Sequence, residues 1–283
     1  GVSTEKVWEY ATHYGIPKMI VINGLDKEGS HFDQALALVR SFFGERAFPL
    51  TVPVNAGPGF NRVLDVLRNE IITYHADASG KYDEAPAAEE WKDEVETLHK
   101  QLIEYIAESD DTLLEKFFDQ GSLSEEEMRS GIHTAVQKQS FIPVFAASAE
   151  TNVGVARMMD FIAKYGSSPA DRAKVKATDG DDNEIELGLA DPKPALYVFK
   201  TSSEAHVGDM SFFRLYSGAV KTGMELYNSD RKTFERIGQI FILNGKNRTS
   251  VTGLGAGDIG AMVKLKDTHT GNTLCDADRP VSL

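Results

Sequence analysis

The chain has 283 residues, of which 41% are hydrophobic, so it is long enough for about two globular domains, each with a buried core. Its 43 acidic and 30 basic residues give a net charge of −13, which argues against binding to nucleic acid or an anionic membrane by electrostatic attraction alone. The single cysteine, Cys275, excludes an internal disulfide and a cysteine-rich metal site, and it indicates a reducing, cytoplasmic location. Because no run of about 18 apolar residues is present, we predict no membrane span and no signal peptide.

The N-terminal part of the chain alternates between predicted helices and strands. Residues 7–14 carry apolar side chains at helical spacing, and the short apolar run 18–22 follows as a strand. A second amphipathic helix, 32–43, precedes a second predicted strand, 48–54. This order predicts consecutive units of an α/β domain.

The composition then becomes strongly acidic. Residues 75–130 contain 17 acidic and 5 basic side chains, a net charge of −12 that accounts for nearly all of the charge of the chain. Apolar side chains between Trp91 and Ile106 repeat at helical spacing, and Ser124 to Glu127 has the form of a capping box that begins a further helix. We therefore predict an α-rich acidic insertion at about 55–140.

A buried-strand pattern returns at 142–147 and is followed by an amphipathic helix at 153–162, so the α/β domain is predicted to resume and to span residues 1–166. Residues 167–192 are polar and proline-containing, which predicts a linker or a surface hairpin. The remaining residues, 193–283, form short apolar or alternating runs separated by glycine, a pattern typical of an antiparallel β-barrel.

Two predicted loops carry the best candidates for a binding site. Asn23 and Asp26 follow the first strand, and Ser148 and Ala149 follow the strand at 142–147. The carboxyl ends of strands in an α/β sheet are the usual place for a ligand. The Asp26 carboxylate could accept two N–H bonds from the Watson–Crick edge of guanine, and the small Ala149 would allow a backbone N–H to approach the guanine carbonyl. A plain Asx turn is the structural alternative for Asp26.

Two further segments match known binding motifs only in part, and their surroundings argue against a binding site. The Gly255–Gly260 stretch matches G-x-G-x-x-G, but it leads into a predicted strand rather than a helix, so we interpret it as a turn of the barrel. Residues 179–190 resemble a calcium loop but have Glu184 in place of the turn glycine and Ala190 in place of the closing glutamate. We therefore predict no metal ligands in this chain.

The two loops and their surroundings resemble a known family. Asn23–Asp26 resembles the Asn-Lys-x-Asp base-recognition motif of GTPases, and Ala147–Ala149 resembles their Ser-Ala motif. Residues 7–17 are similar to the segment before the base motif in translation elongation factor G, and three later segments are similar to its second domain, namely 208–218, 256–259 and 266–276. The resemblance to this family of translational GTPases covers essentially the whole chain.

The resemblance implies a fold and a function. The expected fold is α/β, the C-terminal half of a P-loop GTPase domain with its α-rich acidic insertion, followed by an antiparallel β-barrel. It implies that Asn23, Asp26, Ser148 and Ala149 bind the guanine of GTP or GDP, in a parent protein that couples GTP hydrolysis to movement of tRNA and mRNA. It also implies that the barrel, 193–283, binds ribosomal RNA and that the acidic helices near 86–138 face the ribosomal stalk protein.

The sequence departs from the family in two ways. Gly24 replaces the motif lysine, whose aliphatic stem covers one face of the guanine, so nucleotide affinity or exchange is expected to change. A Gly-x-x-x-x-Gly-Lys-Ser/Thr phosphate loop is absent, and the family's phosphate and Mg²⁺ ligands should precede Gly1. We therefore expect this chain to belong to a longer GTPase, to be unable to hydrolyse GTP alone, and to self-associate through an uncovered sheet edge.

Two alternatives remain open. The parent could be a ribosomal-protection protein or a specialised paralogue of elongation factor G, an interpretation motivated by Gly24. In a different functional class, the chain could be a non-catalytic ribosome-binding module, because it contains no residues for phosphate binding. Binding to ribosomes that is indifferent to nucleotide would favour the module.

Overall fold

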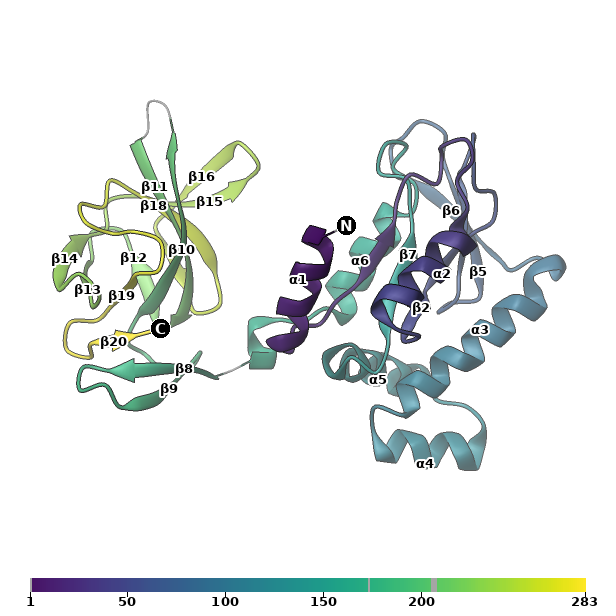
Figure 1. Ribbon diagram of the computed structural model, residues 1–283, viewed down its shortest axis with the longest axis horizontal. Helices are drawn as coiled ribbons and strands as arrows, with labels where there is room; N and C mark the ends of the chain where they lie inside the picture. Colours follow the sequence, from purple (N-terminus) through teal and green to yellow (C-terminus); the bar gives the residue numbers. More distant parts are fainter. Residues whose placement is uncertain (1, 173, 205–207) are drawn as a thin grey trace. The chain divides into compact units, whose positions relative to one another are not determined.

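The computed structural model describes residues 2–172, 174–204 and 208–283, which are drawn in Figure 1. The chain divides into two compact units, the first ending at Ser167 and the second beginning at Ser168. The first unit is α/β and the second is built from antiparallel strands, so the predicted fold class is confirmed. Within the described residues, no helix is long and apolar enough to cross a membrane.

The first unit is organised around a small parallel sheet in which β7 lies between β1 and β2. Ile22 of β1 pairs with Ala146 of β7, and Pro49 of β2 pairs with Val144 of β7. Helix α2 contacts β1 and β2, and helix α6 packs on β7 through the Phe145 and Phe161 rings, whose centroids are 5.2 Å apart. The elements of this sheet layer are α1 (Val2–His13), β1 (Ile20–Ile22), α2 (Phe32–Phe43), β2 (Ala47–Pro49), β7 (Ile142–Ala146) and α6 (Val155–Tyr165).

The insertion between β2 and β7 begins with strands rather than with helices. Four strands form an antiparallel sheet in sequence order: β3 (Thr51–Pro53), β4 (Arg62–Asp65), β5 (Glu70–Tyr74) and β6 (Tyr82–Pro86). The single strand predicted at 48–54 is divided, because the chain leaves the parallel sheet at Leu50. The Leu50 N–H still donates to Val144, whereas its carbonyl accepts from Val66 of the new sheet.

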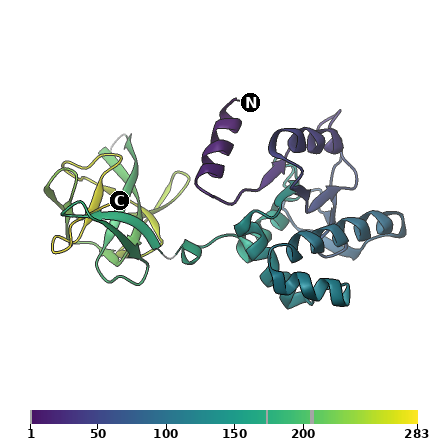
Figure 2. The same ribbon diagram turned by 60° about the horizontal axis from the view of Figure 1, so that its bottom comes forward.

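Three helices complete the insertion, and the first of them buries the face that the helical spacing predicted. They are α3 (Glu89–Ala107), α4 (Asp111–Gln120) and α5 (Glu125–Lys138), shown in Figures 1 and 2. Leu102, Ile106 and Ile132 are at most 1% exposed and join the same core as the sheet. The predicted capping box is confirmed, because Ser124 accepts from the Glu127 N–H and the Glu127 carboxylate accepts from the Ser124 N–H.

A buried arginine joins α6 to the insertion. Arg157 is 5% exposed, and its Nε lies 3.0 Å from Oδ2 of Asp65 in β4. Its Nη2 lies 3.0 Å from Glu84 Oε1 and 3.5 Å from Glu70 Oε2, and its guanidinium sits over the Tyr82 ring at 5.6 Å. Burial raises the pKa of Asp65, and the neighbouring Arg157 charge opposes that shift. The arginine therefore makes the burial of this carboxylate tolerable.

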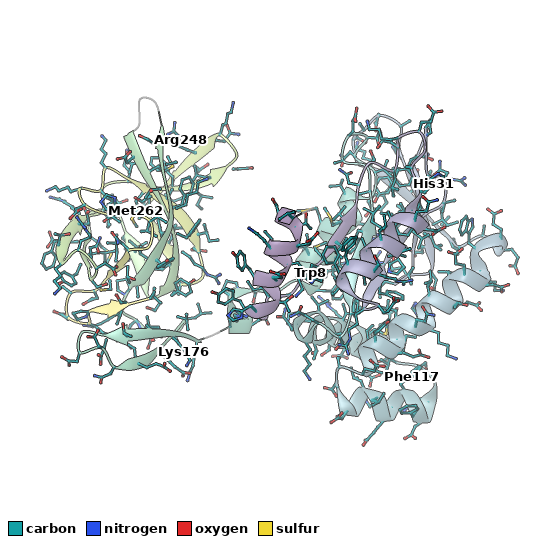
Figure 3. All side chains as sticks on the ribbon, viewed as in Figure 1. Trp8, His31, Phe117, Lys176, Arg248 and Met262 are labelled. Carbon is teal, nitrogen blue, oxygen red and sulfur yellow. The ribbon has the colours of Figure 1, made fainter. Side chains whose placement is uncertain are left out.

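The second unit contains an eight-stranded antiparallel sheet in the order β14-β13-β19-β10-β11-β18-β15-β16. No pairing of β14 with β16 closes this order among the described residues, so the expected barrel is a barrel-like sheet. Leu196, Phe213 and Met262 are among the buried side chains of its core, and Met262 is labelled in Figure 3. The strands are β10 (Ala195–Glu204), β11 (Gly208–Ser217), β13 (Glu225–Asn228), β14 (Thr233–Arg236), β15 (Ile240–Asn244), β16 (Asn247–Val251), β18 (Ile259–Val263) and β19 (Thr273–Cys275).

Two smaller sheets belong to the same unit. Strands β12 (Ala219–Lys221) and β17 (Gly253–Gly255) form a ribbon, and β20 (Val281–Ser282) extends a hairpin of β8 (Lys174–Asp179) and β9 (Glu184–Gly188). That hairpin and the short helix η1 (Pro169–Arg172) occupy most of the range 167–192, for which the sequence predicted a linker or a surface hairpin. The hairpin is held because Leu187 and Ala177 are buried against Cys275 and Val281, which are distant in sequence.

The Arg157 network gives a testable prediction. Arg157→Met should lower the free energy of unfolding of the first unit by about 3 kcal/mol, because it removes the buried guanidinium that pairs with the Asp65 carboxylate and leaves that carboxylate with the backbone N–H groups of Leu67 and Arg68. Both tryptophans, Trp8 and Trp91, lie in the first unit, so their fluorescence during urea unfolding reports on that unit alone.

Lys92→Met is the matched control, because Lys92 lies on the exposed surface of α3, where it forms an ion pair with Glu89 at 3.8 Å. Adding Asp65→Asn to Arg157→Met should restore part of the lost stability. Equal stability of the two single methionine variants would contradict the assigned role of Arg157.

Candidate functional site

The four predicted site residues lie on two loops at the carboxyl-terminal end of the strands of the parallel sheet. Asn23 follows the last residue of β1, and Ser148 lies two residues beyond the end of β7. Because β1 and β7 are parallel neighbours, their carboxyl ends lie side by side at the same end of the sheet. The structure thus brings together Asn23 and Asp26 from the first loop with Ser148 and Ala149 from the second, more than 120 residues later in the chain.

Hydrogen bonds hold the two loops together. The Ala147 N–H donates to the Ile22 carbonyl at 3.0 Å, and the Leu25 N–H donates to the Ala147 carbonyl at 3.3 Å. The Asn23 side chain accepts the Ala149 N–H through Oδ1 at 2.9 Å. Asn23 therefore occupies the Ala149 N–H, one of the backbone N–H groups of the second loop, and in this structure the Asn23 amide fixes the position of that loop.

Asp26 lies close to Ser148 and Lys27. Its side chain is 12% exposed, and Oδ2 lies 3.5 Å from the Lys27 ammonium. Its Oδ1 is buried and accepts no hydrogen bond of standard geometry from the described residues. The Ser148 hydroxyl beside Asp26 is the main cause that lowers the pKa of this carboxyl, with a smaller contribution from Lys27. Asp26 is therefore a carboxylate at neutral pH, and its Oδ1 has unused capacity to accept an N–H group.

The second loop is held by its backbone and by a glycine. The Ser148 and Val153 N–H groups exchange hydrogen bonds with each other's carbonyls at 3.0 and 2.9 Å, and Ser148 Oγ accepts the Thr151 N–H. Gly154, at φ +80°, ends the loop, and a Cβ there would lie 2.3 Å from the Ala146 carbonyl oxygen. Only glycine allows the loop to return this closely to β7.

Two charged residues of the site were missed by the sequence analysis. The Lys27 ammonium lies 2.5 Å from Glu150 Oε2, and this ion pair joins the two loops on the solvent side of Asp26. Lys27 directly follows Asp26 and Glu150 directly follows Ala149, so opposite charges at equivalent places in the two loops were the available signal. No group of three or more His, Cys, Asp or Glu side chains in the described parts of the chain is arranged to hold a metal ion.

The Ser148 hydrogen bond gives a prediction about titration. Ser148→Ala should raise the pKa of Asp26 back toward 3.8, because it removes the largest cause of the low value. The stability that the charged Asp26 contributes is complete above pH 3.8 and disappears as the pH falls through the lowered pKa of the folded state. Carboxyl ¹³C chemical shifts followed from pH 6 to 2 would measure the change. Asp179, whose pKa is lowered chiefly by the Asn183 N–H, is the internal control, and an unchanged Asp26 midpoint would contradict the prediction.

Comparison with known proteins covers both units. Residues 193–277 match the family described as elongation factor G domain 2. A solved structure of a protein from Thermus thermophilus matches 99% of this chain with a TM-score of 0.81 and 27% sequence identity. The chain spans 39% of the length of that protein. Residues 193–277 are thus similar to elongation factor G domain 2, and the fold of the chain as a whole is similar to that of the Thermus thermophilus protein.

Proposed function

We propose that the chain is part of a translational GTPase similar to elongation factor G, and that Asn23, Asp26, Ser148 and Ala149 form the guanine side of its nucleotide site. The observation that carries this proposal is the position of Asp26. Its carboxylate is kept ionised by Ser148, has one oxygen without a hydrogen bond, and lies where two loops meet at the carboxyl edge of a parallel sheet. A carboxylate in this position suits the adjacent N–H groups of guanine and not the edge of adenine.

The phosphates and Mg²⁺ require other residues. The sequence contains no Gly-x-x-x-x-Gly-Lys-Ser/Thr phosphate loop, so we assign Mg²⁺ binding and GTP hydrolysis to other parts of a longer protein. When bound there, the metal would neutralise charge on the phosphates. The residues of this chain would select and orient the base.

We further propose that the second unit and the acidic insertion contact the ribosome in the cytoplasm. The second unit, which matches elongation factor G domain 2, is assigned to ribosomal RNA. The insertion is assigned to the stalk protein, because the net charge of −12 on its residues 75–130 favours a protein surface with basic patches over RNA. Its α4 carries Phe118, which is 77% exposed, beside Phe117, whose position is labelled in Figure 3.

Nucleotide selectivity tests the proposed base site. GDP should shift the backbone amide NMR signals of residues 23–27 and 148–150, and ADP at the same concentration should not, because adenine presents mismatched hydrogen-bonding groups to Asp26. Asp26→Ala should abolish the GDP effect. Asp181→Ala, at an exposed turn of the second unit, should leave it unchanged. Equal responses to GDP and ADP, or no response to either, would contradict the proposed site.

Self-association of the isolated chain is a second prediction. Strand β1 is an edge strand of the parallel sheet, and the neighbouring α1 exposes Val7 and Tyr10 by 65% and 63%. An open edge beside exposed apolar side chains favours contact between copies. Light scattering should show a mass that rises with protein concentration, and Val7→Glu with Tyr10→Glu should reduce it. Ile242→Glu, at an exposed position of the second unit, is the control. A single monomer mass at high concentration would contradict self-association.

A further inference from the structure

Lys27 occupies the space beside Gly24 in the first loop. Gly24 adopts φ +79°, and its missing side chain leaves this side of the loop open. Apart from its chain neighbours, the only described atom within 4 Å of the position of a Gly24 Cβ is Lys27 Cγ, at 3.9 Å. The methylene stem of Lys27 thus lies against Gly24, where a side chain at position 24 would begin.

The two ends of the Lys27 side chain are both held. Its stem lies against Gly24, and its ammonium lies between Glu150 Oε2 at 2.5 Å and Asp26 Oδ2 at 3.5 Å. The hydrogen bond to Glu150, followed by the Asp26 charge, raises the pKa of Lys27. Because the two carboxylates come from different loops, the ion pair directs the stem across the place where the loops meet.

We propose that Lys27 forms one wall of the guanine site, with its methylene stem against a face of the base and its ammonium held by Asp26 and Glu150. This inference rests on the proposed function, because it needs a base bound at Asp26. A planar base has two weakly polar faces that gain from contact with an alkyl chain, and a lysine can give its stem to such a contact while its charge stays in water. The Lys27 ammonium contacts Asp26 Oδ2, so it does not use the acceptor capacity of Oδ1.

Lys27 could instead hinder guanine binding, and a measurement of affinity distinguishes this from the proposed wall. If Lys27 instead blocked the site by occupying Asp26, removing its side chain would strengthen binding. If it forms a wall, removal of the stem weakens binding, whereas removal of the charge alone has little effect. Lys27→Ala removes both the stem and the charge, and Lys27→Met keeps a stem of similar length without the charge, so these two variants separate the two mechanisms.

The experiment is a titration of the whole chain with guanosine, with adenosine as the control nucleoside, followed by the backbone amide NMR signals of Gly24 and Ala149. Guanosine avoids any dependence on phosphate contacts. Lys27→Ala should bind guanosine about five- to tenfold more weakly than the unmodified chain, a modest loss because the Lys27 side chain is 60% exposed. Lys27→Met should stay within about threefold of it. Lys92→Ala, on the exposed surface of α3, is the matched lysine control.

The possible results distinguish a failure of the Lys27 wall from a failure of the base site at Asp26. Guanosine binding that Lys27→Ala weakens and Lys27→Met retains would support the wall. Guanosine binding that is unchanged or stronger in Lys27→Ala would overturn the wall while leaving the base site at Asp26 in place. Absence of guanosine-selective shifts in the unmodified chain would overturn the base site and, with it, the wall. Circular dichroism of each variant checks that the fold is retained.

Discussion

The parallel pairing of β1 with β7 is the constraint on which the candidate site depends. Ile22 lies opposite Ala146, so the loops after these two residues begin side by side although more than 100 residues separate them. Parallel neighbours cannot be joined by a tight turn, and the chain must travel from one end of the sheet to the other between them. Here that crossover has been enlarged into a sheet and three helices without changing the edge where Asn23 meets Ala149.

The site is positioned mainly by backbone and by short side chains. Backbone hydrogen bonds fix Leu25 and Ala147, and the close return at Gly154 fixes the second loop. The Asn23 amide and the Ser148 hydroxyl then orient the groups around Asp26. The longer charged side chains, Lys27 and Glu150, lie on the outside of this frame, where they can respond to a ligand without disturbing the loops.

Much of the fold could be predicted from the sequence because local patterns determined it. Helical spacing identified the buried faces of α2 and α3, and the Ser124 capping box marked the start of α5. The meander β3–β6 was missed because its strands have only three to five residues, too few for a clear periodicity. The β8–β9 hairpin was also not distinguished from a linker, since its polar residues gave no local signal and its burial depends on Cys275 and Val281.

The candidate site could be predicted in part for the same reason. Asp26 and Ser148 were identifiable because each follows a recognisable apolar strand, and the carboxyl ends of neighbouring parallel strands lie side by side. The use of the Ala149 N–H by Asn23 and the pairing of Lys27 with Glu150 depend on side-chain conformations across two loops. No pattern within either loop specifies those conformations.

The way in which the chain leaves and re-enters the parallel sheet has a consequence for the modularity of this fold. It departs at Leu50, after the carboxyl end of β2, and returns at Ile142, at the amino end of the neighbouring parallel strand β7, so the insertion must span the length of these short strands. A different module grafted between these two positions would have to replace the contacts that the present insertion makes with the site loops, namely the hydrogen bonds from the Gly57 N–H to the Leu25 carbonyl and from the Asn152 side chain to the Ala78 carbonyl. The graft would have to supply carboxylates for Arg157 or be accompanied by its replacement, because α6 would otherwise keep a buried guanidinium whose partners Asp65, Glu70 and Glu84 had been removed. Arg157 thus restricts the first unit to insertions that provide carboxylates for its guanidinium.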